Sequence, residues 1–166
     1  MTGQFRIEAL APKHDRAAFA CGSAPLDKYL REQASQDMRR RTSACYVAID
    51  EATNAIAGYY TLAAGSVPLT DLSEAMAKKL PRYPLVPVAR VGRLAVSVAF
   101  QKRQLGATLL WDAGLRAMQS GMGVFALVVD AKDKTAAAFY EHHGFVGFSS
   151  NPLTYVLPIA TLAKKN

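Results

Sequence analysis

The chain has 166 residues, of which 51% are hydrophobic and 20% charged, and it carries a formal net charge of +7. These values are typical of a globular protein, and they predict one domain over residues 1–166 with a core of its own. No apolar stretch approaches the ~18 residues that a membrane span needs, and none follows a basic start as in a secretory leader. We therefore expect a cytoplasmic protein that does not enter the membrane.

Local patterns in the first half predict helices and strands in alternation. Ser23 is a residue type that caps helices, and Pro25 follows just inside the helix start. The prolines between 81 and 87 keep their predecessors out of helix, so that stretch is expected to be extended. In chain order we predict a strand over 5–10, a helix from Ser23 to about Arg40, strands over 44–50 and 56–64, and a short helix that Asp71 caps and that ends at Lys79.

The second half is predicted to contain a strand–helix–strand–helix unit. The run VFALVV at 124–129 is apolar throughout, as in a central strand covered on both faces. Gly144 is expected to close the helix before it. In chain order we predict a strand over 88–96, a helix over 104–119, the strand over 124–129, a helix over 135–143 preceded by Asp133 or Lys134, and strands over 145–148 and 154–157. The fold class is therefore mixed α/β.

The positive charge is concentrated in one segment. Residues 75–111 hold seven basic side chains and no acidic one, whereas the rest of the chain holds 13 of each kind. Arg39, Arg40 and Arg41 form a second basic cluster. Such a segment is either a solvated face or the binding surface of a polyanion such as nucleic acid.

The stretch RLAVSVAFQKRQLGATLLWDA, residues 93–113, has the pattern of a strand that turns through a basic loop into a helix. The start of a helix offers backbone N–H groups and a positive dipole end to an anion. The chain contains neither GxxxxGKS/T nor GxGxxG, which disfavours a P-loop nucleotidase and a dinucleotide-binding domain. By itself the pattern fits an ordinary strand–helix turn as well as a phosphate site.

Several separated motifs together resemble one family. GRLAV, FQKRQLGATLL and VDAKDKTAAAFYEHHGF, in this order, resemble the GCN5-related N-acetyltransferase (GNAT) family. CGSAPLDKYLREQASQDMRRRT, PVARVGRLAV and NPLTYVLP are similar to its tRNA-acetylating toxin branch, the TacT and AtaT type of type II toxin–antitoxin systems. The resemblance covers about residues 4–160. It implies a mixed, mostly antiparallel central sheet flanked by helices, with strands splayed at an acetyl-CoA cleft.

The resemblance also implies which residues bind acetyl-CoA, the acetyl-donor substrate. Strand residues pair with its pantetheine arm and loop N–H groups bind its pyrophosphate; the implied set is Leu94, Ala95, Val96, Gln101, Lys102, Arg103, Gln104, Leu105, Gly106, Ala107, Lys132 and Phe139. A glycine is usual in the family where this chain has Gln104. Because a positive φ is uncommon for other residues, we expect ordinary dihedrals at Gln104 with its N–H still directed at phosphate; the alternative is weakened acetyl-CoA binding.

Tyr140 matches the tyrosine that lies near the thioester in the toxin branch, and the resemblance implies that it is the catalytic residue. A phenol with a pKa near 10 can donate a hydrogen bond or a proton to a leaving thiolate, whose pKa is near 8.5. Spacing alone fits an aromatic side chain packed on an amphipathic helix equally well. The N–H of a residue near Val96 is a candidate to polarise the carbonyl. No side chain stands out as general base, and an aminoacyl α-amine with a pKa of about 8 can rely on solvent.

In the toxin branch the acceptor is the α-amine of aminoacyl-tRNA, and its acetylation blocks translation. The implied phosphate contacts are Arg39, Arg40, Arg41, Lys78, Lys79, Arg82, Arg90 and Arg93. Members of the branch are typically homodimers that a ribbon-helix-helix antitoxin inhibits. Two alternatives stay open: a GNAT enzyme for a small-molecule amine, which the acid-free segment disfavours, and a non-catalytic RNA-binding module on the same scaffold, which Tyr140 disfavours.

We expect no metal site and no disulfide. Cys21 and Cys45 fit no metal-ligand spacing, and reduced thiols are the expected state for a cytoplasmic protein. His142 and His143 are adjacent, so they project about 100° apart on a helix and are poorly placed to share a ligand.

Overall fold

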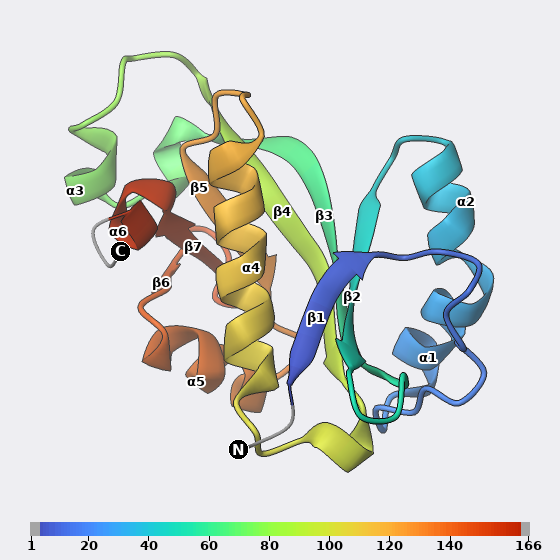
Figure 1. Ribbon diagram of the computed structural model, residues 1–166. Coiled ribbons are helices and arrows are strands. Elements are labelled where there is room, and N and C mark those ends of the chain that lie inside the picture. The colour runs from blue at the N-terminus through green and yellow to red at the C-terminus, as the bar shows by residue number, and fades with distance from the viewer. Residues whose placement is uncertain (1–3, 164–166) are drawn as a thin grey trace. The chain divides into compact units, whose positions relative to one another are not determined.

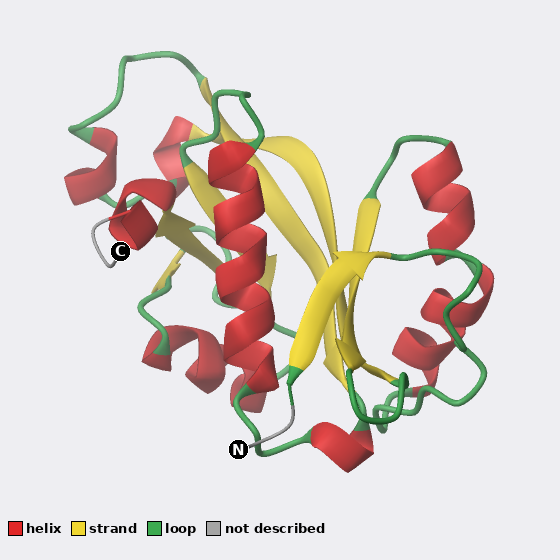
Figure 2. Cartoon of the chain, viewed as in Figure 1, coloured by secondary structure: helices red, strands yellow, loops and turns green. Residues whose placement is uncertain are grey.

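The computed structural model describes residues 4–163, whose helices and strands are drawn in Figures 1 and 2. The described residues divide into two compact units. Unit 1 comprises residues 4–63 and 92–113, and unit 2 comprises residues 64–91 and 114–163. The strands are hydrogen-bonded in the order β1-β2-β3-β4-β5-β7-β6. The β4–β5 pair is parallel, and the β1–β2, β2–β3, β5–β7 and β6–β7 pairs are antiparallel. This mixed, mostly antiparallel sheet with its helices confirms the predicted fold class.

Unit 1 is built around a cluster of aromatic side chains. Its elements are β1 (Phe5–Ala9), α1 (Ala24–Glu32), α2 (Ala34–Arg39), β2 (Ala44–Asp50) and η2 (Val98–Phe100), with parts of β3 (Ile56–Pro68), β4 (Leu85–Val96) and α4 (Leu105–Gln119). Phe19, Tyr29 and Tyr59 are all buried. The Phe19 and Tyr59 rings meet edge to face at 5.5 Å, an arrangement that aromatic pairs prefer.

Gly58 on β3 lets three elements of unit 1 approach closely. A Cβ at this position would lie 2.9 Å from the carbonyl oxygen of Ala95 on β4 and 3.1 Å from Cδ1 of Leu109 on α4. Only glycine fits such a contact without displacing its neighbours. The contact seats the first turns of α4, and with them the loop that leads into this helix.

Unit 2 is built around a strand that is buried on both faces. Its elements are η1 (Leu69–Asp71), α3 (Glu74–Ala77), β5 (Ala126–Asp130), α5 (Lys134–His142), β6 (Val146–Gly147), β7 (Thr154–Pro158) and α6 (Ile159–Ala163), with the remaining parts of β3, β4 and α4. Ala126 to Val129 have no exposed surface, so side chains on both faces of β5 are covered, and β4 and β7 flank it in the sheet. This confirms the prediction of a covered central strand.

Some element boundaries differ from the predictions for local reasons. The single helix predicted from Ser23 to Arg40 is broken at Gln33, where φ is −118°, and forms α1 and α2. Ser73, not Asp71, caps α3, since its side chain accepts a hydrogen bond from the Met76 N–H. The predicted strand at 124 begins at Ala126, and α6 was not predicted. Within residues 4–163, no helix has both the length and the apolar character needed to cross a membrane.

Candidate functional site

The predicted pantetheine strand, Leu94–Val96, lies at the end of β4 in unit 1. The parallel pairing of β4 with β5 runs from Val88 to Val91, so these three residues lie beyond it. Gln101 then turns back: its side-chain amide donates to the Val96 carbonyl at 3.0 Å and to the Cys21 carbonyl at 3.2 Å. The Gln101 side chain therefore ties the loop to β4.

The loop between β4 and α4 presents backbone donors without acceptors. None of the described residues accepts a hydrogen bond from the backbone N–H of any residue from Lys102 to Ala107. The first helical bond of α4 runs from the Thr108 N–H to the Gln104 carbonyl at 3.1 Å. Residues 101–104 are exposed, and the positive end of the 15-residue helix α4 lies at the same place. Such a run of N–H groups fits an anion with several oxygen atoms, such as a pyrophosphate.

The backbone of this loop contradicts the prediction for Gln104. Its φ is +62°, and Lys102 has a φ of +67°, so the expectation of ordinary dihedrals was wrong. The loop keeps the left-handed geometry for which glycine is usual, although a residue with a Cβ loses about 1–2 kcal/mol there. The turn from η2 into α4 overrides the preference of the residue. Backbone strain of this kind gathers at ligand-binding loops, where it directs N–H groups toward a ligand.

Two cations accompany the N–H groups. Lys102 and Arg103 are both exposed. The Arg103 guanidinium lies 5.4 Å from the centre of the Phe100 ring, and that ring packs edge to face on Phe5 at 5.8 Å. Phe100 thus limits the directions in which Arg103 extends, and both charges add attraction for an anion at the start of α4.

Tyr140 lies on α5 in unit 2, inside an aromatic cluster. Asp133 caps the start of α5, since its carboxylate accepts a hydrogen bond from the Ala136 N–H at 2.8 Å. The Tyr140 ring is 7% exposed and packs against Phe145 at 5.5 Å and Tyr155 at 6.3 Å. Tyr140 is therefore a packed aromatic side chain, and its predicted catalytic role stays a prediction.

The hydroxyl of Tyr140 is less enclosed than its ring. No described residue shares a hydrogen bond with it, and no fully buried side-chain oxygen or nitrogen in residues 4–163 lacks a partner, so this hydroxyl reaches the surface. Burial, and then the negative charge of Asp130, raise the pKa of Tyr140 to about 12. A phenol in this state keeps its proton at neutral pH and acts as a hydrogen-bond donor.

The other two predicted cofactor residues of unit 2 lie on either side of the start of α5. Phe139 is half-buried and packs edge to face on Tyr140 at 5.4 Å and on His143 at 4.7 Å. Lys132 is exposed, just before the Asp133 cap. Their predicted role in acetyl-CoA binding stays a prediction.

A family model described as an acetyltransferase (GNAT) domain matches residues 41–147, which is more than half of the chain. The chain belongs to the GNAT acetyltransferase family. A protein of Mycobacterium tuberculosis named tRNA-acetylating toxin is 33% identical over 159 residues, which cover 95% of this chain and 93% of that protein. The relatives of this GNAT chain therefore include toxins.

Solved structures agree with the family. The structure of AtaT complexed with acetyl-methionyl-tRNAfMet is 25% identical, with a TM-score of 0.89 over 98% of this chain and 99% of that one. A tyrosine-to-phenylalanine mutant of AtaT, bound to the C-terminus of the antitoxin AtaR and acetyl-CoA, is 24% identical, with a TM-score of 0.78 over 98% and 97% of the two chains. At 24% identity, the likeness to this second structure shows only a shared fold.

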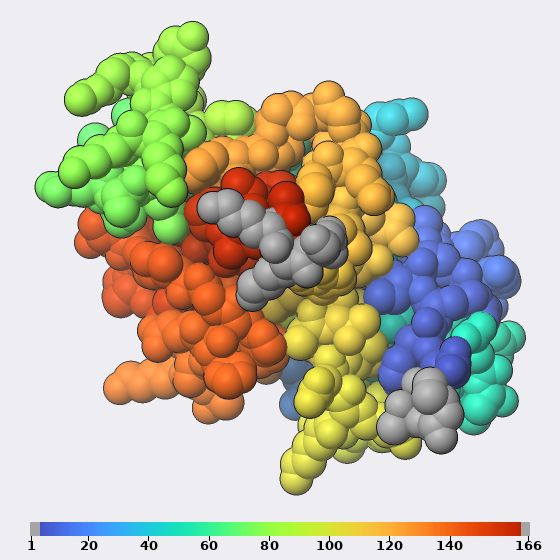
Figure 3. Space-filling view, turned by 60° about the vertical axis from the view of Figure 1, so that its left-hand side comes forward, coloured from blue at the N-terminus to red at the C-terminus, as the bar shows by residue number. Residues whose placement is uncertain are grey.

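The predicted RNA contacts of this GNAT chain fall into exposed and engaged side chains. Arg39, Arg40 and Arg41 are exposed at the end of α2 in unit 1, and Lys78, Lys79 and Arg82 are exposed around α3 in unit 2, which Figure 3 draws in light green at the surface. Arg90 instead forms an ion pair with Asp130 at 2.8 Å. Arg93 lies over the ring of Tyr29.

Sequence reasoning missed three residues beside these predicted ones. Asp130 binds Arg90 and accepts a hydrogen bond from Thr154 at 2.8 Å. Tyr29 and Asp37 share a hydrogen bond of 2.6 Å next to Arg93. Asp130 lies within the family motif VDAKD, so the motif could have pointed to it. Nothing in the sequence pairs Tyr29 with Arg93.

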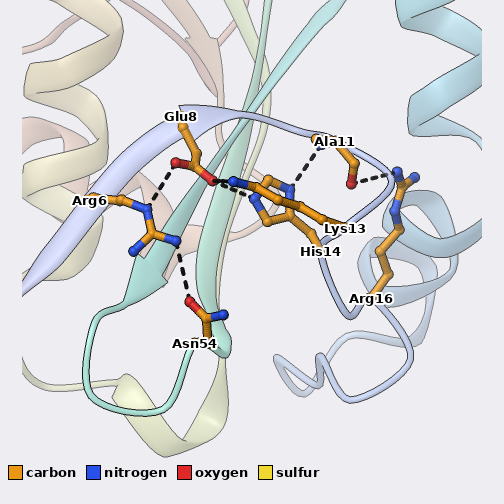
Figure 4. Close-up of polar contacts among 7 residues, drawn as sticks. All are labelled: Arg6, Glu8, Ala11, Lys13, His14, Arg16 and Asn54. Carbon is orange, nitrogen blue, oxygen red and sulfur yellow. Dashed lines mark hydrogen bonds and ion pairs between the residues drawn. The ribbon is translucent and has the colours of Figure 1, made fainter.

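A second cluster of ionisable groups lies on β1 and the loop after it (Figure 4). Glu8 contacts Arg6 at 2.9 Å and His14 at 2.6 Å. The other ring nitrogen of His14 accepts the Ala11 N–H at 2.9 Å, so both nitrogens are occupied and neither is free to act as a base. In the part of the chain that the structure describes, no group of three or more His, Cys, Asp or Glu side chains is placed to hold a metal ion.

Proposed function

We propose that this protein transfers the acetyl group of acetyl-CoA to the α-amine of an aminoacyl-tRNA and thereby blocks translation. The main support for aminoacyl-tRNA as the acceptor is the similarity, over 95% of the chain, to a protein named a tRNA-acetylating toxin. Exposed basic side chains in both units support it, because they attract an RNA backbone. An enzyme with this acceptor works in the cytoplasm, where charged tRNA is found.

The donor site in this proposal is the loop before α4. The N–H groups of Lys102–Ala107 would bind the pyrophosphate of acetyl-CoA, with charge attraction from Lys102 and Arg103. Leu94–Val96, beyond the β4–β5 pairing, would bind the pantetheine arm as an added strand does. We further propose that residues 1–166 act as one acetyltransferase domain, since β3, β4 and α4 each pass from one unit into the other.

The reaction is an acyl transfer from sulfur to nitrogen. The neutral amine attacks the thioester carbonyl, a C–N bond forms, the C–S bond breaks, and the amine proton leaves to solvent. The Tyr140 hydroxyl would donate a hydrogen bond to the departing sulfur. With a phenol pKa of about 12 and a thiol pKa of about 8.5, full proton transfer is uphill by about 5 kcal/mol. Tyr140 therefore stabilises the thiolate and keeps its proton, and the thiolate is protonated by solvent.

Two partners belong to the proposal. A second copy of the chain would form a homodimer, which places more basic surface against one tRNA. A ribbon-helix-helix antitoxin would hold the toxin inactive in the cell. Both follow from the toxin branch, and size-exclusion chromatography with light scattering of the purified chain, alone and with its antitoxin, measures both.

The proposal is tested by incubating the protein with charged total tRNA and labelled acetyl-CoA. Label on the aminoacyl group of intact tRNA is expected, and mass spectrometry then identifies the amino acid. Label only on added small amines would replace the acceptor with a small molecule. Retention of RNA without any label would leave a non-catalytic RNA-binding module.

The role of Tyr140 has a matched control in its own cluster. Tyr140→Phe removes the free hydroxyl and is expected to abolish transfer, while acetyl-CoA still binds. Tyr155→Phe removes a neighbouring hydroxyl that donates to Glu141 at 2.7 Å, and it is expected to retain transfer. Near-normal turnover of Tyr140→Phe would refute its catalytic role.

A further inference from the structure

Arg93 stacks closely on an aromatic ring, whereas the other arginine of unit 1 beside a ring, Arg103, lies 5.4 Å from the centre of Phe100. Its guanidinium carbon lies 3.6 Å from the centre of the Tyr29 ring, which is stacking distance. Arg93 is half-buried, yet within residues 4–163 no side chain or carbonyl accepts a hydrogen bond from its guanidinium. A guanidinium has five N–H donors, and leaving them unpaired while partly removed from water is unfavourable. The N–H groups of Arg93 that reach the surface are therefore available to an external acceptor.

The ring beneath Arg93 is held in one orientation. The Tyr29 hydroxyl donates to Asp37 at 2.6 Å, and the Gln33 amide donates to the other oxygen of the same carboxylate at 3.0 Å. The ring lies nearly parallel to that of Tyr59, with centres 6.4 Å apart. The bond from Tyr29 to Asp37 joins α1 to α2 across the break at Gln33.

Asp37 is subject to the charges of two arginines that are far apart in the sequence. The hydrogen bond from Tyr29 is the main cause that lowers the pKa of Asp37, and the charges of Arg93 and Arg40 lower it further. Asp37 forms no ion pair with either arginine among the described residues. Asp37 supplies one negative charge, whereas Arg93 and the exposed cluster Arg39–Arg41 supply four positive ones. The net charge of this group of side chains is therefore positive.

We propose that Tyr29 and Asp37 position Arg93 so that its guanidinium binds a backbone phosphate of RNA, with Arg40 at the end of α2 as the neighbouring phosphate contact. Stacking on Tyr29 covers a face of the guanidinium and leaves its N–H edge for the two oxygens of a phosphate, a geometry that lysine lacks. The inference deepens the proposed function, on which it rests for the identity of the RNA. Tyr29 and Asp37 are positioning residues, since neither is expected to touch the RNA.

The first test measures the affinity of the full chain for uncharged tRNA at several salt concentrations. Arg93→Gln is expected to reduce the slope of log affinity against log salt by about 0.7–0.9, the value for one phosphate contact. Arg93→Lys keeps the charge and is expected to keep the slope but to lose about 3–10-fold in affinity, because stacking and bidentate binding are lost. An unchanged slope in Arg93→Gln would overturn the proposal.

The second test asks whether Tyr29 acts through Arg93. Tyr29→Leu removes the platform and is expected to weaken tRNA binding in the wild-type background but not further in Arg93→Gln, with acetyl-CoA affinity unchanged in both. Tyr29→Phe keeps the ring and loses the bond to Asp37, so it repeats the cycle if Tyr29→Leu does not fold. Equal losses in the two backgrounds would overturn the positioning role. Arg31→Gln is the matched control, because Arg31 is exposed and lies two positions from Tyr29, about 200° around α1.

The outcomes separate this inference from the proposed function. Binding is measured without acetyl-CoA, so a failure of tRNA acetylation would count against the proposed function and leave the salt slopes standing. If tRNA is acetylated while Arg93→Gln binds it as the wild type does, the inference alone fails. Polyglutamate is the competitor that represents an acidic protein partner, and an Arg93-dependent affinity for it that exceeds the affinity for tRNA would overturn the choice of RNA.

Discussion

Replacing Gln104 by glycine tests whether the loop before α4 is a strained anion site. Gln104 has a φ of +62° and an exposed side chain, so the substitution relieves left-handed strain and removes no buried contact. Relief is about 1–2 kcal/mol, and the greater freedom of glycine in the unfolded chain takes back about 0.5–1 kcal/mol. We expect a net gain of about 0.5–1 kcal/mol, or a rise in Tm of about 1–4 °C for a chain of this size.

The function of the loop gives the second half of this prediction. Because glycine keeps the same backbone, the N–H groups keep their directions, and calorimetry should give an acetyl-CoA affinity within about twofold of the wild type. Gln104→Pro cannot adopt a positive φ and lacks an N–H, so it should lower that affinity more than tenfold, as expected for a lost turn and donor. A lower Tm together with weaker acetyl-CoA binding in Gln104→Gly would refute the reasoning, because the glutamine side chain would then be the ligand.

Lys102 supplies the matched control for this loop. Its φ of +67° is nearly the same, but its side chain is a cation. Lys102→Gly should therefore gain a similar amount of stability while it loses acetyl-CoA affinity, since strain is relieved and a charge beside the pyrophosphate is removed. Parallel behaviour of the two glycine variants in the binding assay would contradict the assignment of a phosphate site.

Three further predictions concern unit 1. A hydrogen bond with His14 is the main cause that lowers the pKa of Glu8 from 4.5 to about 2. The ionised carboxylate therefore stabilises the fold above pH 4.5, and this stabilisation is lost as the pH falls toward 2. Glu8→Gln should flatten the dependence of urea-unfolding free energy on pH between 2 and 4.5, and an unchanged dependence would count against this assignment. Gly58→Ala places a methyl group 2.9 Å from a backbone oxygen and should cost about 1–3 kcal/mol of unfolding free energy; a neutral effect in denaturant melts would mean that the elements separate easily. Burial raises the pKa of the Cys45 thiol to about 12, so a thiol reagent should modify Cys45 only after unfolding, and fast modification of the native protein would show that the core opens.

Local pattern was sufficient for most elements of this fold. The apolar run that became β5, the capping residues around α5 and the basic turn before α4 all act within a few residues, so their signals can be read from the sequence. The order of the motifs was sufficient to indicate the GNAT family, which the family match confirms. The helix predicted over 23–40 is interrupted at Gln33, where φ is −118°, and no local pattern in the sequence signals that interruption.

The sequence by itself determined which residue types are available for chemistry: a run of loop N–H groups, a tyrosine on a helix, and cations without nearby acids. Tertiary structure decided which of them are engaged. Arg90 and Arg93 are alike in the sequence, yet the parallel pairing of β4 with β5 places Arg90 beside Asp130, whereas the packing of α1 places the Tyr29 ring under Arg93. It likewise set φ at Gln104, because the path from β4 into α4, not the preference of one residue, determines the backbone at that turn.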